Sequence, residues 1–149
     1  MRRLAFVLIT FLGTAALATD GAVSDEDTLF RDGTELTLEE FQWFKRPVVV
    51  FADSPNDPRF QQQIDLLEAQ PQALETRDVV VLMDSNPAAK SALRERLRPR
   101  GFMMVLVGKD GVVYLRKPQP WNVRELTRSI DKLPLRQQEE RDRRADPIR

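Results

Sequence analysis

Three short runs of apolar residues constrain the fold of this 149-residue chain more than any other feature. They cover residues 48–52, 79–83 and 102–107, and valine dominates the first two. Continuous runs of this length are typical of strands buried on both faces of a sheet, because a strand with one wet face alternates apolar and polar residues. In the segments after the first and the second run, apolar residues recur at the spacing of one face of a helix. We therefore expect an α/β domain with these three strands at its centre.

Proline and capping residues indicate where helices begin. Asp57-Pro58 and Asn86-Pro87 each place an N-cap residue before a proline in the first helical turn. They predict helices after the first two strands, the second of which reaches Leu97. Thr37 and Glu40 form a capping box that predicts a further short helix before the first strand.

The chain after residue 107 predicts a hairpin and one more helix. The glycine-bounded turn 108–111 joins the third run to a fourth strand over 112–115. Asn122 then caps a helix that Pro134 is expected to close. The element order is thus β-α-β-α-β-β-α. We predict a thioredoxin-like, four-stranded mixed sheet flanked by helices, with an extra N-terminal helix.

The first 18 residues have the features of a secretory signal peptide. A cationic start at Arg2 and Arg3 precedes the apolar run 4–12, and a small-x-small pattern ends at Ala18, where we expect cleavage. The alternative is an uncleaved anchor, but the run is well short of the roughly 20 residues that span a bilayer. We expect a periplasmic or secreted protein with no stable membrane span after cleavage.

The mature chain divides into three segments. Residues 19–36 are acidic and poor in apolar side chains, which predicts a flexible leader. Residues 37–136 form the expected domain. Residues 137–149 alternate in charge without an apolar stripe, which predicts a charged, flexible tail.

The chain has neither cysteine nor histidine, and this double absence excludes much chemistry. It supplies no thiolate, no disulfide exchange and no cysteine-ligated metal. The usual general base near neutral pH and the commonest metal ligand are also missing. We expect no metal site and no cofactor. The net charge after signal removal is near −2, which argues against nucleic-acid binding.

The loop after the first strand is one candidate binding site. The carboxyl end of a strand that leads into a helix is where α/β folds bind ligands, and free backbone amides there favour anions. The alternative is that Asp57 caps the helix and leaves no donor for a ligand. The candidate residues are Asp53, Ser54, Asn56, Asp57 and Arg59.

An arginine cluster is a second candidate site. Arg94 and Arg98 are expected to share a helix face, and Arg96 and Arg100 lie close by. Such a cluster can bind a carboxylate, a phosphate or an acidic partner. It can equally be the ordinary solvent face of an amphipathic helix.

Two tryptophans have two interpretations each. Trp43 and Trp121 are candidate interface anchors, because buried interfaces favour large aromatic side chains. They also suit packing against the core or the edge of the sheet.

Several stretches together resemble the P-DUDES family, a domain of unknown function in bacterial exported proteins and in animal extracellular proteins that include sushi-repeat proteins. Phe41-Gln42-Trp43 precedes the first strand, Gly-Lys-Asp-Gly occupies 108–111, and residues 130–139 read Ile-Asp-Lys-Leu-Pro-Leu-Arg-Gln-Gln-Glu. Members more often have Met where Leu135 stands. The resemblance covers roughly residues 38–141.

The resemblance implies a thioredoxin-like fold, a distant relation to peroxiredoxins and no established activity. Thioredoxins carry their redox pair just after the first core strand, where this chain has Pro55 and Pro58. Their cis-proline before the hairpin is also missing, because Phe102-Met103 stands there and Pro99 comes too early. We predict a non-catalytic binding module for an unknown protein or a small anionic ligand. The alternative is an enzyme that uses an external thiol such as glutathione near Ser54.

Overall fold

The computed structural model describes residues 28–146 and contains one five-stranded sheet with the order β1-β3-β2-β4-β5. The expected signal peptide and its cleavage after Ala18 lie outside these residues. The strands are β1 (Phe30–Asp32), β2 (Arg46–Phe51), β3 (Val79–Asp84), β4 (Met103–Val107) and β5 (Val113–Lys117). The helices are α1 (Pro58–Glu68), α2 (Pro71–Glu75), α3 (Ala92–Leu97), α4 (Val123–Asp131) and α5 (Pro134–Ala145), with 3-10 turns η2 (Glu39–Phe41) and η3 (Pro87–Ala89).

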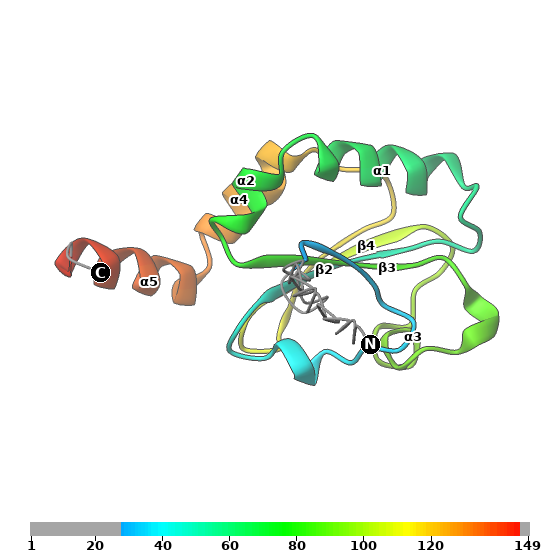
Figure 1. Cartoon of the computed structure of the whole chain (residues 1–149), viewed down its shortest axis with the longest axis horizontal. Coiled ribbons are helices and arrows are strands. Elements are labelled where there is room, and N and C mark those ends of the chain that lie inside the picture. The colour runs from blue at the N-terminus through cyan, green and yellow to red at the C-terminus, as the bar shows by residue number, and fades with distance from the viewer. Residues whose placement is uncertain (1–27, 147–149) are drawn as a thin grey trace, which may run out of the picture.

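The topology confirms the predicted α/β, thioredoxin-like class. β2 pairs with β3 in parallel, whereas β2–β4 and β4–β5 are antiparallel. Figure 1 shows α1, α2 and α4 over one face of the sheet and α3 with η2 on the other. No helix within residues 28–146 is both long and apolar enough to cross a membrane.

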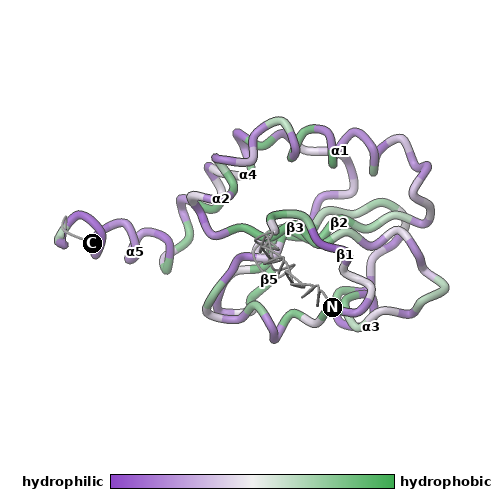
Figure 2. Tube along the Cα trace, viewed as in Figure 1, coloured by the Kyte–Doolittle hydropathy of each residue, from purple (hydrophilic) through white to green (hydrophobic). Residues whose placement is uncertain are grey.

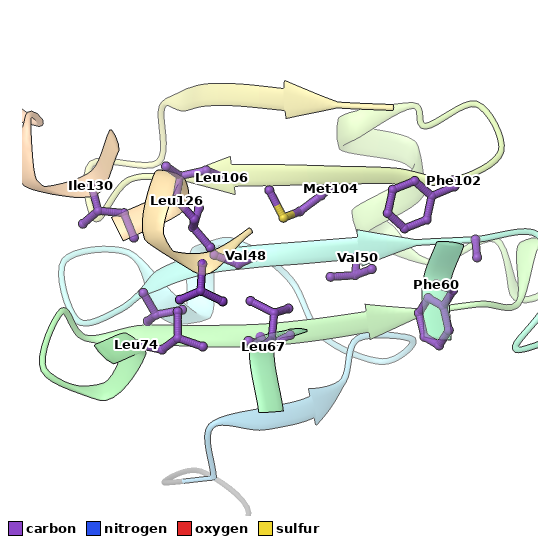
Figure 3. Packing of buried hydrophobic residues seen from close by; sticks show 14 residues of the cluster. Val48, Val50, Phe60, Leu67, Leu74, Phe102, Met104, Leu106, Leu126 and Ile130 are labelled. Carbon is purple, nitrogen blue, oxygen red and sulfur yellow. The ribbon is translucent and has the colours of Figure 1, made fainter. Parts of the chain in front are cut away.

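The central strands are apolar on both faces because each face is covered. Val48 and Val50 of β2 belong to the cluster under α1, α2 and α4, and Val49 belongs to the cluster on the α3 side. The same alternation runs along β3 and β4. Figure 3 shows the first cluster, where Leu67, Leu74 and Leu126 from the helices meet these valines. In Figure 2 the hydrophobic colour is concentrated on the central strands β2 and β3, whereas β1 and α5 are largely hydrophilic.

The sheet has a fifth strand, β1, which the sequence did not predict. β1 lies in the segment predicted to be a flexible leader and pairs in parallel with β3. The backbone N–H of Val81 donates to the carbonyl of Leu29 (2.7 Å), and the N–H of Gly33 donates to Met83 (2.8 Å). Leu29 and Phe30 also pack against the first cluster. These two apolar residues stabilise the short edge strand, although the segment around them is acidic.

Two predicted helices are shorter than expected. The extra N-terminal helix is the single 3-10 turn η2, because the Thr37 hydroxyl meets the Glu40 side chain (3.4 Å) and caps no backbone N–H. The helix expected after Asn86 is divided by Lys90, whose backbone is left-handed (φ 48°). α3 therefore begins after a second cap, Ser91, which accepts the N–H of Arg94 (3.2 Å).

The segment predicted to be a loose tail is helical to Ala145. Pro134, expected to close α4, instead occupies the first turn of α5, where its missing N–H costs no helical hydrogen bond. Charged pairs three and four residues apart stabilise α5, including Arg136–Glu140 and Arg143–Glu140. α5 extends away from the body of the domain at the left of Figure 1.

Candidate functional site

The loop at the carboxyl end of β2 forms an open hollow lined by Asp53, Ser54, Asn56, Asp57 and Arg59, together with Pro58. Asp57 caps α1 by accepting the backbone N–H of Arg59 (2.9 Å). The Arg59 side chain turns back onto the same carboxylate (Nη2–Oδ2 3.0 Å). This side-chain hydrogen bond lowers the pKa of Asp57, and the backbone N–H of Arg59 lowers it further. The Asp57 and Arg59 side chains thus pair with each other, and Asp57 also caps the end of the helix.

Ser54 is the one hydroxyl in this loop, and its contacts stabilise the turn. Its Oγ accepts the backbone N–H of Asn56 (3.2 Å). No hydrogen bond joins this hydroxyl to a carboxylate or an amine among residues 28–146. A serine without an adjacent base is a weak nucleophile.

Arg94 lies in a buried network rather than on a solvent face. Its Nε donates to Asp84 (3.0 Å), and its Nη2 donates to the carbonyls of Ala52 (2.6 Å) and Asp84 (3.0 Å). The Ser91 hydroxyl donates to the other Asp84 oxygen (2.5 Å), and the guanidinium stands over the ring of Phe51 (5.4 Å). Arg94 therefore joins the carboxyl ends of β2 and β3.

The arginine cluster predicted from the sequence does not form a single face. Arg98 is exposed and adopts a left-handed conformation (φ 49°) at the C-cap of α3. Arg96 and Arg100 are also exposed, whereas the Arg94 guanidinium is buried. The expectation that Arg94 and Arg98 share a helix face was wrong, because α3 ends at Leu97 and Arg98 is its C-cap.

Neither a metal-binding cluster nor a cis-proline occurs at the carboxyl end of the sheet within residues 28–146. Within residues 28–146 there is no cluster of acidic side chains that could hold a metal ion, and no peptide bond is cis. Pro99 precedes β4 on the α3 side and Phe102 is buried in the core, so neither is a counterpart of the thioredoxin cis-proline.

The amino end of the sheet presents exposed apolar side chains instead. Trp43 and Phe44 are 63% and 73% exposed, and Val112 and Tyr114 are also exposed. We call these four residues the aromatic surface. The backbone N–H of Trp43 donates to Lys109 in the β4–β5 turn (2.7 Å), which ties the two segments together.

Hydrogen bonds also hold the β4–β5 turn in place. Gln42 donates to the carbonyl of Asp110 (3.3 Å), and the Tyr114 hydroxyl donates to the Asp110 carboxylate (2.5 Å). The hydrogen bond to Asp110 raises the pKa of Tyr114. By contrast, Trp121 is partly buried against the core, and its backbone exchanges two hydrogen bonds with Gln63 (2.8 and 3.0 Å).

A buried ion network beside the aromatic surface was missed from the sequence. Arg46, only 1% exposed, donates to Glu139 of α5 (3.0 Å) and to the carbonyl of Arg77 (2.8 Å). Lys109 pairs with both Asp78 and Glu139 (2.8 Å each). Burial raises the pKa of Glu139, but the hydrogen bonds from Lys109 and Arg46 together outweigh it and lower the pKa overall. The network fixes the start of α5 to the domain.

A family model described as a domain of unknown function (DUF4174) matches residues 37–139. The match ends at Glu139, the residue of α5 that the buried arginine and lysine bind.

Solved structures of peroxiredoxins resemble the fold. The reduced 2-Cys peroxiredoxin of Plasmodium vivax is 16% identical with a TM-score of 0.56, over 70% of this chain and 85% of that one. Prx1a of Plasmodium yoelii, in a form modified at the N-terminus, is 18% identical with a TM-score of 0.53, over 70% and 81%. At these identities the likeness concerns the fold alone.

Proposed function

The chain belongs to the DUF4174 family, and on that premise we propose that it is an exported, non-catalytic binding domain that recognises a protein partner through the aromatic surface. The domain has a thioredoxin-like fold and no cysteine, so thiol chemistry of its own is excluded. The resemblance to the exported P-DUDES domains and the signal-like first 18 residues support export.

The observation that carries this proposal is the conformation of Trp43. Its φ is 70°, in the left-handed region that costs a non-glycine residue roughly 1–2 kcal/mol. Its side chain is largely exposed, so core packing does not offset that cost. Strained residues of this kind gather at functional sites. Glycine would suit the fold better at this position, and tryptophan is the side chain that most often anchors a protein interface.

The surroundings of Trp43 suit an interface. The backbone hydrogen bond to Lys109 and the ion pairs of Lys109 hold the two segments in place before any partner binds. A preorganised anchor loses less conformational entropy on association. Phe44 and Tyr114 extend the apolar area around it.

The alternative of an external thiol such as glutathione receives less support. The loop around Ser54 is open, and the Ser54 hydroxyl and the Asp57 carboxylate already hydrogen-bond within the loop or to the end of α1. The same hydrogen bonds also weaken the interpretation that this loop binds an anion.

Replacement of Trp43 by glycine tests the proposal. We expect Trp43→Gly to leave the free energy of unfolding unchanged or to raise it by up to about 1 kcal/mol, because the backbone strain is relieved. Affinity for the partner should fall by at least about tenfold, because an anchor is lost. The measurement is capture from an envelope extract, followed by titration of the purified captured protein.

The matched control is Arg100→Ala, an exposed substitution at the opposite end of the sheet. It should leave both stability and capture unchanged. A partner held equally well by wild type and Trp43→Gly, or lost with Arg100→Ala, would contradict the proposal.

A further inference from the structure

A pocket beside α4 and α5 is separate from the aromatic surface and from the loop at residues 53–59. Its volume is about 520 Å³, within the size range of small-molecule sites. Four arginines and two acids form most of its wall: Arg77, Arg136, Arg141, Arg144, Asp131 and Glu140.

Arg136 in this wall is a buried cation with unused donors. Only 5% of the residue is exposed, and its Nη2 binds Glu140 (2.6 Å). Its Nε and Nη1 have no hydrogen-bond partner, because Asp131 is 3.7 Å from Nε and Glu139 is 3.5 Å from Nη1. Buried N–H groups are nearly always paired. Hydrogen bonds from a charged guanidinium are stronger than those between neutral groups. Both atoms are covered by the protein, so Arg136 offers a ligand in the pocket its positive charge and not these two N–H groups.

The charges around the pocket favour an anion. Both acids already have arginine partners: Arg77 holds Asp131 through two bonds (2.8 and 2.9 Å), and this pairing lowers the pKa of Asp131. Arg141 binds only the neutral Gln138 (2.7 Å). Arg144 has no ion-pair partner among residues 28–146. The wall therefore carries two positive charges in excess.

We propose that this pocket binds a small oxyanion, a phosphate group or a compact polycarboxylate, through Arg136, Arg141 and Arg144. The planar fork of a guanidinium matches the oxygen pairs of both groups. Arg136 supplies a fixed positive charge at the buried end, and Arg141 and Arg144 supply charge and hydrogen-bond donors at the open end. The site lies outside the aromatic surface, and the inference does not depend on the proposed function.

The test is calorimetric titration of the protein with inorganic phosphate and, separately, with citrate, which distinguishes the two oxyanion classes. We expect at least one to bind with a Kd of about 1 mM or tighter. The Nε–H resonance of Arg136 should shift on binding. Arg141→Ala with Arg144→Ala should raise the Kd by about tenfold or more, because two positive charges of the wall are lost. Both residues are exposed, so we expect the double variant to keep the fold.

The charge-matched control is Arg100→Ala with Arg124→Ala, which removes two exposed arginines outside the pocket. Its Kd should stay within about twofold of wild type at constant ionic strength. The inference is overturned if neither anion binds at millimolar concentration, if the control weakens binding as much as the pocket variant, or if Arg136 gives no shift.

Discussion

Arginine has three different roles in this protein, and the surroundings of each side chain decide which. Arg94 is enclosed by the ends of two strands and neutralises a buried carboxylate. Arg46 is more deeply buried than Arg94 and reaches across to α5. Arg98, four residues after Arg94, is exposed in a left-handed turn. Because Arg94 and Arg98 each follow a leucine in the chain, the local sequence does not separate the structural cation from the surface one.

Arg94→Ala should lower the free energy of unfolding by about 3 kcal/mol, because it leaves the buried Asp84 carboxylate without a counter-charge, with only the Ser91 hydroxyl and the Asn86 backbone N–H as partners. Arg96→Ala is the matched control on the same helix, and its exposed side chain should contribute less than about 0.5 kcal/mol. Urea denaturation measures both. Equal losses for the two variants would show that Arg94 does not stabilise the sheet ends.

The elements whose existence was mispredicted are those stabilised mainly by tertiary contacts. β1 has three residues, and it forms because β3 offers an unpaired edge. Gly33 ends β1 at a point where a Cβ would lie 2.7 Å from the Leu93 side chain and 3.3 Å from the Met83 carbonyl, so the chain approaches the sheet closely. α5 lacks an apolar stripe, and the ion pairs of Glu139 with Arg46 and Lys109 hold its first turns to the domain instead.

Glu139→Gln should destabilise the fold by about 2 kcal/mol at pH 7, because Arg46 then lacks its buried counter-charge. The folded-state pKa of Glu139 lies below its usual 4.5, so its contribution is present above that pH and is lost as the pH falls through the folded value. The stability difference between wild type and variant should therefore shrink on acidification below about pH 4.5. Denaturation series from pH 7 to acid measure this.

Glu125→Gln provides the comparison for the pH series. Its pair with Arg128 is exposed and should contribute less than about 0.5 kcal/mol. A stability difference for Glu139→Gln that stays constant down to strongly acidic pH would exclude the carboxylate as its cause.

At the scale of the whole molecule, the two ends of the sheet differ in character. The carboxyl end, where α/β folds usually bind ligands, has polar groups that are paired with one another. The amino end has exposed aromatic side chains, and the arginine-lined pocket lies near it, where Arg77 precedes β3 and pairs with α4. The fold shared with peroxiredoxins therefore does not by itself indicate the position of a binding site in this domain.

The protein should not reduce hydrogen peroxide with dithiothreitol as the electron donor, because it has no thiolate to attack the peroxide. Peroxide consumption should match that of buffer alone, with an active peroxiredoxin as the positive control. Glutathione should produce no NMR shifts at Ser54. Saturable, protein-dependent consumption, or shifts confined to that loop, would revive the external-thiol alternative.

The sequence by itself determined the central strands, their order along the chain and the exclusion of thiol chemistry. Apolar runs bounded by caps and turns report local burial, and an absent residue type is absent in any fold. Only the tertiary structure decided that the leader contributes β1, that the tail forms α5, and which arginines are buried. It also placed Trp43 in a left-handed, exposed conformation and gathered the pocket. These properties depend on contacts between residues far apart in the chain, such as Arg46 and Glu139, which local periodicity does not encode.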